Sequence, residues 1–230
     1  RREAADPAVR LADAAAAYTD ALYVAAEKTL GSDVVAGLDE AVDRVVPGLS
    51  EEAAWPALRA HLLLLGAAGE DPVAMLTAAA GDRELTASRD SAAVLDWRLD
   101  ASGLRNSGRG PLPWLHAAPA AIASHETWGP YLEQRAQLVT TLAEQVRERA
   151  EASTITPAWA TNGARLEPTV RGNVEVWRAA MGVDPTDRRP TGPAQQQKVA
   201  GTWQRRLNKQ VAGDRTPAIR EWKHVLDGVS

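Results

Sequence analysis

The stretch LADAAAAYTDALYVAAEKTLG, residues 11–31, decides the fold class of this chain. Side chains suited to one buried helix face recur in it every three or four positions, at Leu11, Ala15, Tyr18, Leu22 and Ala26. The acidic side chains of this stretch are spaced seven residues apart, which places them together on another side of the predicted helix, where they face solvent. An Asp-Pro pair precedes the stretch, which is typical of a helix start, and a Gly-Ser pair follows it. The pattern predicts an amphipathic helix.

Similar patterns continue along the chain, in which helix formers dominate and β-branched residues are sparse. Capping residues, prolines and glycines divide it into further helices. We expect these to begin at or near Ser32, Ser50 (with a reset at Pro56), Asp71, Asp90, Pro130, Pro168, Val199 and Thr216. The helix after Pro56 carries leucines on several faces, so it should be buried nearly all round. The prediction is an all-α, bundle-like fold of about 8–10 helices, as one domain or as two packed helical subdomains.

The periodicity fails between residues 101 and 128, where prolines and glycines cluster. We therefore expect an N-terminal helical subdomain over 1–100, a Pro/Gly-rich connection over 101–128, and a C-terminal helical subdomain over 129–230. The connection is either a linker or an ordered segment that Trp114 and Leu115 pin in place. The C-terminal end is basic: residues 155–230 carry 12 basic and 7 acidic side chains, against 14 and 23 in residues 1–154.

The composition excludes several classes of protein. The chain of 230 residues has no cysteine, so disulfides, thiolate metal sites and cysteine nucleophiles are absent. Its longest apolar run, residues 62–68, is far shorter than the roughly 20 residues of a membrane span, and we predict no membrane insertion. The sequence begins with Arg1 and shows no signal peptide, so we expect a piece of a longer protein.

No motif of metal, phosphate or acyl-transfer chemistry is recognisable. The four histidines, His61, His116, His125 and His224, are dispersed, and His125-Glu126 lacks the second histidine of a zinc-protease motif because position 129 is glycine. We interpret them as ordinary surface or capping residues. Gly108-Arg109-Gly110 precedes a proline rather than a helix, and Ser107 lacks a nucleophile elbow. The sequence therefore predicts no catalytic residue, no cofactor and no metal, and hence no enzyme in this chain.

Cationic side chains near the C-terminal end are candidate contacts to DNA phosphates. Two of them share the face of the helix after Pro168 that lies opposite the apolar side chains of Val174 and Trp177. The others lie in the turn that follows this helix and on the next helix. The candidates are Arg171, Arg178, Arg188, Arg189, Arg205, Arg206 and Lys209. The alternative is a merely solvated face. We interpret Trp177, Trp203 and Trp222 as core residues, and Trp114, Trp128 and Trp159 as residues that pin loops or bind a ligand.

Three stretches carry a resemblance to a known family: residues 11–31, residues 112–139 (LPWLHAAPAAIASHETWGPYLEQRAQLV) and residues 176–193 (VWRAAMGVDPTDRRPTGP). They resemble the C-terminal region, beyond the helicase, of actinobacterial MobF-type conjugative relaxase-helicases. In that family an N-terminal domain nicks plasmid DNA with a tyrosine and a histidine-bound metal, and a helicase follows. Neither constellation occurs in this sequence, so no catalytic residue is carried over.

The resemblance implies an accessory tail that acts in plasmid transfer without catalysis. Its partners would be proteins of the conjugation and secretion machinery or the other domains of the same relaxase-helicase. The acidic first part, the helix from Pro130 and the Pro-rich middle would offer the protein-binding surfaces. The alternative function is an accessory DNA-binding domain that uses the basic C-terminal helices. The sequence leaves the partner's identity and the oligomeric state open.

Overall fold

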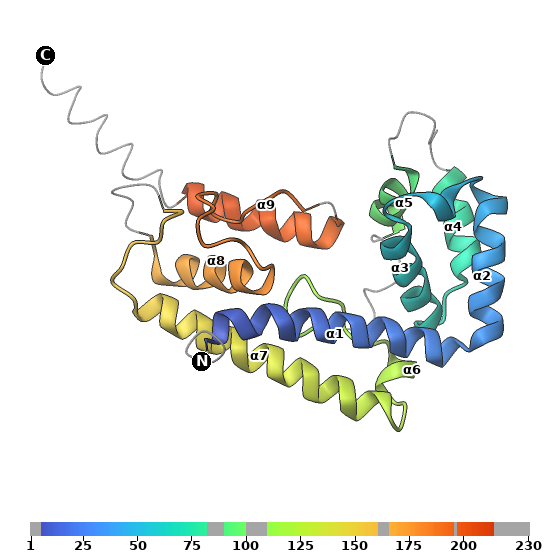
Figure 1. Ribbon diagram of the computed structural model, residues 1–230, viewed down its shortest axis with the longest axis horizontal. Coiled ribbons are helices and arrows are strands. Elements are labelled where there is room, and N and C mark those ends of the chain that lie inside the picture. Colours follow the sequence, from blue (N-terminus) through green and yellow to red (C-terminus); the bar gives the residue numbers. More distant parts are fainter. Residues whose placement is uncertain (1–5, 82–89, 100–109, 161–165, 196, 214–230) are drawn as a thin grey trace, which may run out of the picture. The chain divides into compact units, whose positions relative to one another are not determined.

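A computed structural model describes residues 6–81, 90–99, 110–160, 166–195 and 197–213 (Figure 1). This described part contains nine α-helices and no strand, which confirms the predicted all-α, bundle-like fold there. The helices are α1 (Pro7–Leu30), α2 (Ser32–Val45), α3 (Trp55–Ala67), α4 (Pro72–Gly81), α5 (Ser91–Leu99), α6 (Ala120–Ala123), α7 (Trp128–Ala152), α8 (Pro168–Ala180) and α9 (Lys198–Gly213). A 3₁₀ turn, Leu49–Glu51, precedes α3.

The helix boundaries follow the capping residues read from the sequence. Asp71 accepts hydrogen bonds from the backbone N–H groups of the first turn of α4, and Asp90 does the same for α5. The prediction placed the start of α7 at Pro130, but the helix begins earlier, because His125 Nδ1 accepts from the N–H groups of Thr127 and Trp128. The short helix α6 was not predicted. The helix expected after Thr216 lies outside the described residues.

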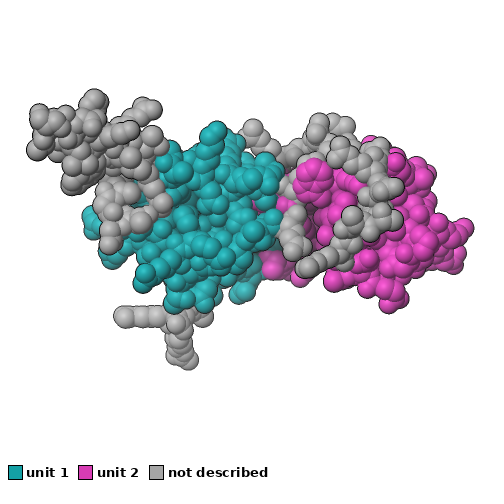
Figure 2. Space-filling model, turned by 90° about the horizontal axis from the view of Figure 1, so that it is seen from above, with its two compact units in different colours: residues 1–15, 138–195, 201–230 teal, residues 16–137, 196–200 magenta. Residues whose placement is uncertain are grey.

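The chain divides into two compact units that are discontinuous in sequence (Figure 2). Unit 1 comprises residues 1–15, 138–195 and 201–230, and unit 2 comprises residues 16–137 and 196–200. The helices α1, α7 and α9 each contribute to both units. Of the connection expected over 101–128, residues 110–128 are ordered and belong to unit 2, while residues 101–109 lie outside the described part.

Unit 2 is built around α3, which contacts α4, α5 and α6, while α2 contacts α4. The predicted burial of α3 on nearly all sides is confirmed: its five leucines, at 58, 62, 63, 64 and 65, are at most 1% exposed. Tyr18 and Leu22 of α1 are buried in the same unit. Because α3 also places His61 in this apolar surrounding, at 5% exposure, that side chain needs polar partners inside the unit.

Unit 1 packs the second part of α7, α8, the segment 184–195 and α9. Val139 and Val146 of α7, Val174 of α8 and Leu207 of α9 are buried in its core. At Gly172 a Cβ atom would lie 2.8–2.9 Å from side-chain atoms of Glu151 and Arg147, so glycine permits α8 to approach α7 closely. Trp159 is buried and its Nε1 donates to Glu175 Oε1 at 2.7 Å, which ties the segment before α8 to that helix.

Candidate functional site

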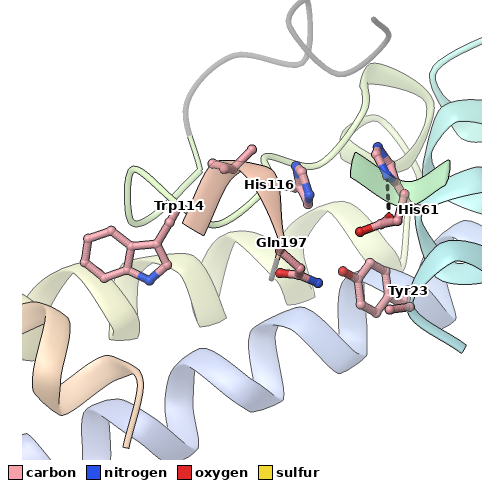
Figure 3. A pocket seen from close by; sticks show the side chains of 8 residues that line it. Tyr23, His61, Trp114, His116 and Gln197 are labelled. Atoms are coloured by element: carbon pink, nitrogen blue, oxygen red, sulfur yellow. Dashed lines mark hydrogen bonds and ion pairs between the residues drawn. The ribbon is translucent and has the colours of Figure 1, made fainter. Parts of the chain in front are cut away.

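A small polar pocket lies within unit 2 (Figure 3). Its wall comes from α1, α3, α5, the segment 110–119 and the start of α9, through Tyr23, Ala57, His61, Asp96, Trp114, His116, Gln197 and Val199. In Figure 3 the side chains of Tyr23, His116 and Gln197 gather around one space, with Trp114 farther along it. The pocket is partly open to solvent, and the space inside it is about 20 Å³, which accommodates a water molecule but not an organic substrate.

His61 and Asp96 form the charged centre of this pocket. His61 Nδ1 lies 3.0 Å from Asp96 Oδ1, and only 7% and 13% of the two side chains are exposed. An ionised carboxylate can only accept, so Nδ1 carries the proton in this pair and Nε2 is left as the second ring nitrogen. The arrangement fixes both the orientation and the tautomer of His61.

His116 stacks on His61, with 5.7 Å between the ring centroids and 24° between the ring planes. Burial and, to a smaller extent, the neighbouring His61 lower the pKa of His116 from 6.5 to about 4, whereas Asp96 acts in the opposite direction. The main-chain oxygen of His116 accepts a 2.8 Å hydrogen bond from the Tyr18 hydroxyl. His116 is therefore a neutral imidazole near pH 7, held at both its ring and its backbone.

Tyr23 completes the polar lining as a neutral phenol. Burial raises its pKa to about 12, with smaller contributions from Asp96 and Asp20. Among the described side chains that line the pocket, none is a serine, threonine, cysteine or lysine that could act as a nucleophile. Across the described ranges, no three His, Asp or Glu side chains converge in a way that could hold a metal ion. The chemistry that this pocket can carry is proton binding and hydrogen bonding around a water-sized space.

The interpretation of the histidines as unrelated surface or capping residues was wrong for two of them. His61 and His116 lie on separate elements and meet in the pocket. His125 does cap α7, as described above, and His224 lies outside the described residues. Ser107, Gly108 and Arg109 also lie outside that part of the chain.

Two of the seven candidate phosphate contacts have a structural role in unit 1. Arg178 is 6% exposed and donates to the carbonyl oxygens of four residues, at 2.7–3.3 Å: Asp184, Asp187, Arg189 and Pro190. Arg171 donates to main-chain oxygens at and directly after the C-terminal end of α7, including those of Glu151 (3.1 Å) and Ser153. Neither side chain belongs to the exposed cationic surface, because the segments that they bind fold back over them.

The other five candidates are exposed in unit 1. Arg188 and Arg189 lie in the segment 184–193, and Arg205, Arg206 and Lys209 lie on α9. Arg189 is paired with Asp187 at 2.5 Å, and the guanidinium of Arg206 lies 4.8 Å from the ring centre of Trp203. Trp203 is half-buried rather than a full core residue, Trp177 is fully buried as predicted, and Trp222 lies outside the described residues.

The segment 184–193 is an ordered part of unit 1, which the sequence did not indicate. Trp177 Nε1 donates to the carbonyl of Thr191 at 2.9 Å, and Gln204 Nε2 donates to the carbonyl of Pro193 at 2.6 Å. The hydroxyl of Thr191 donates to Asn208 Oδ1 at 3.0 Å. A signal for a cationic surface was present in the sequence: residues 188–213 contain six basic side chains and no acidic one.

No family model, no curated protein and no solved structure matched this chain. Within the described ranges, none of the helices combines the length and the apolar character needed to cross a membrane.

Proposed function

We propose that this chain is a non-catalytic accessory domain of a conjugative relaxase-helicase, acting in plasmid DNA transfer by recruiting proteins in the bacterial cytoplasm. The proposal starts from the resemblance of the three stretches named above. The observation that carries it is the structural role of residues 176–193, which are the most specific of the three stretches for the resemblance. Its tryptophan and arginine, Trp177 and Arg178, are engaged by carbonyl groups of the segment 184–193. The motif thus builds an ordered surface, which supports a role in binding.

The first turns of α7 offer a surface for a protein partner. Tyr131 is 39% exposed, and the guanidinium of Arg135 lies 4.5 Å from the centre of its ring. Trp128 meets the same ring edge-on, with 5.9 Å between the centroids. Tyrosine, tryptophan and arginine are the side chains that most often dominate protein interfaces. The expected partner is a protein of the secretion machinery or another domain of the parent enzyme.

Deleting residues 1–230 from the parent protein tests this function. We expect plasmid transfer to fall while nicking and ATPase activity persist. Loss of nicking together with ATPase activity would contradict a purely recruiting role, and unchanged transfer would contradict any role in transfer. Tyr131→Ser addresses the proposed surface alone, and Val24→Ser is a matched control because Val24 is a comparably exposed apolar residue, at 46%. We expect only the first substitution to reduce transfer.

A second candidate function, DNA binding, is favoured by the exposed cations of unit 1. Arg188, Arg205, Arg206 and Lys209 come from a segment without carboxylates, and α9 presents three of them to solvent. Neutralising phosphates releases counterions, so each contact adds about 0.9 to the slope of log affinity against log salt concentration. The alternative remains a solvated face that binds nothing.

Titration of DNA against salt separates the two candidates. Replacing Arg205, Arg206 and Lys209 together by glutamine should lower affinity for DNA and reduce the salt slope by about 2–3. Replacing the exposed cations Arg10, Lys28 and Arg44 by glutamine makes the same charge change elsewhere and should have little effect. Undetectable binding of the unchanged chain at low salt would exclude the DNA-binding function.

A further inference from the structure

The polar pocket of unit 2 joins elements that are distant in the sequence through two titratable rings. Burying polar groups in an apolar surrounding destabilises a fold unless each group has a hydrogen-bond partner. If these positions had only a structural purpose, apolar side chains such as leucine would stabilise the unit equally well. We propose that the stacked His61–His116 pair is a proton-operated latch, which fastens the segment 110–119 to α1 and α3 when singly charged or neutral and releases it when both rings are protonated.

The segment 110–119 is attached to its surroundings chiefly through His116. Its main-chain oxygen is bound by the Tyr18 hydroxyl of α1 at 2.8 Å. Its ring lies against His61 of α3, which Asp96 of α5 holds at 3.0 Å. Gln197, directly before α9, and Val199, at the start of α9, line the pocket beside it. A change in the charge of one ring therefore acts where five elements meet: the segment 110–119, α1, α3, α5 and the start of α9.

The charges facing the pair allow one proton more readily than two. Asp96 is hydrogen-bonded to His61, so its carboxylate balances one imidazolium. The other polar side chains that line the pocket in the described part of the chain, Tyr23 from α1 and Gln197 before α9, are uncharged near pH 7. Asp20 of α1 raises the pKa of Tyr23, and Glu133 of α7 raises that of Tyr18. A second imidazolium, with 5.7 Å between ring centres, would be buried without a carboxylate of its own.

The stability of unit 2 should consequently fall with acid over a defined range. His116 titrates at its ordinary pKa of 6.5 when unfolded and at about 4 when folded. Between these values the unfolded state binds more protons, so stability is complete above pH 6.5 and is lost as the pH falls towards 4. The largest expected loss in the folded-to-unfolded ratio is about 300-fold, which corresponds to the difference between the two pKa values.

Nuclear magnetic resonance on the full 230-residue chain tests the latch directly. The His116 ring signals should titrate near pH 4, and the amide signals of residues 110–119 should change with the same midpoint. His116→Gln keeps a polar side chain but removes the titration, and this transition should then be absent. His125→Gln is the matched control, because His125 is exposed, and the transition should persist in it.

His61→Gln provides a second variant with a distinct outcome. Glutamine can still donate to Asp96 but cannot carry the neighbouring positive charge, so the midpoint of His116 should rise. The latch would be overturned by either of two results in the unchanged chain: titration of His116 near 6.5, or titration near 4 with unaltered amide signals of residues 110–119. A transition that persists in His116→Gln would also overturn it, since carboxylates would then be its cause.

Discussion

The two units each bury a basic side chain, and they satisfy it in different ways. In unit 1 the guanidinium of Arg178 donates to four carbonyl oxygens, so its charge is fully hydrogen-bonded and stays fixed at every pH at which the chain folds. In unit 2 the imidazole of His116 is buried beside another imidazole and is neutral near pH 7. The first arrangement is a permanent cross-link of a surface segment, whereas the second, in the latch proposed above, opens when both imidazoles are protonated.

The difference follows from the acceptors that each side chain finds. Main-chain carbonyls carry no net charge and do not titrate, so the segment 184–193 can surround a cation in any buffer. The His116 ring instead shares its surroundings with His61 and with a single hydrogen-bonded carboxylate, Asp96. We therefore expect substitutions in unit 1 to change the free energy of unfolding by the same amount at every pH. Substitutions in unit 2 should instead change how the free energy of unfolding depends on pH.

The largest effect is expected at Arg178. Arg178→Met removes the donors to four carbonyl oxygens in a site that is 6% exposed, and the free energy of unfolding should fall by about 3 kcal/mol. Urea denaturation at several pH values measures this loss, which should be the same from pH 5 to pH 8. Arg188→Met is the matched control in the same segment and should change stability by less than about 0.5 kcal/mol. Equal effects of the two substitutions would contradict the proposed cross-link.

A smaller effect is expected at Tyr18 in unit 2. Tyr18→Phe removes the hydrogen bond to the main-chain oxygen of His116 while keeping the ring, which is 2% exposed. The free energy of unfolding should fall by about 1 kcal/mol because a part-buried carbonyl loses its donor. Thermal or urea denaturation measures the change. Tyr131→Phe is the control on an exposed tyrosine, and a larger loss there would argue against the importance of the Tyr18 contact.

These two residues also illustrate how far the sequence could predict the structure. Tyr18 belongs to a stripe with helical spacing, and its burial followed from that spacing alone. Arg178 lies opposite the Val174/Trp177 stripe, so helical periodicity predicted an exposed side chain. It is buried because the segment 184–193 folds back over that face, and local spacing contains no information on such a long-range contact.

The polar pocket was hidden from the sequence for the same reason. His61 and His116 lie on a helix and on a Pro-rich segment, and only tertiary packing brings the rings together. One signal could have drawn attention to His61: it is a titratable residue that directly precedes four consecutive leucines, in a helix that was expected to be buried nearly all round. A buried histidine requires a partner, but the sequence could not identify Asp96 or His116 as that partner.

Asp96→Asn should alter pH dependence more than stability at neutral pH. Asp96 raises the pKa of His116 against the larger effect of burial, so removing its charge should lower that pKa below about 4. The acid transition of unit 2 should therefore move to lower pH, opposite in direction to the shift expected for His61→Gln. Ring titration by nuclear magnetic resonance measures both shifts. Shifts in the same direction would mean that loosening of the pocket, rather than charge, sets the titration.

The smallest effect on stability is expected from Asp187→Asn in unit 1. The hydrogen bonds from Arg189 lower the pKa of Asp187 to about 2, so this carboxylate stays ionised throughout the usable pH range and only substitution can remove its charge. The Arg189 side chain is 63% exposed, although that of Asp187 is only 15% exposed, and pairs with a solvated partner contribute little to folding, so the urea midpoint should move only slightly.

The effect of Asp187→Asn on DNA binding should nevertheless be detectable. Arg189 would lose a carboxylate that competes with phosphate for its guanidinium, within a surface that holds several other cations. If the DNA-binding candidate is correct, Asp187→Asn should strengthen binding at low salt and increase the salt slope by up to about 1. Asp43→Asn, which removes an exposed carboxylate from α2, is the control and should leave DNA binding unchanged. An equal gain in both variants would indicate a general effect of net charge. No gain in either, with binding still measurable, would place the DNA away from the segment 184–193.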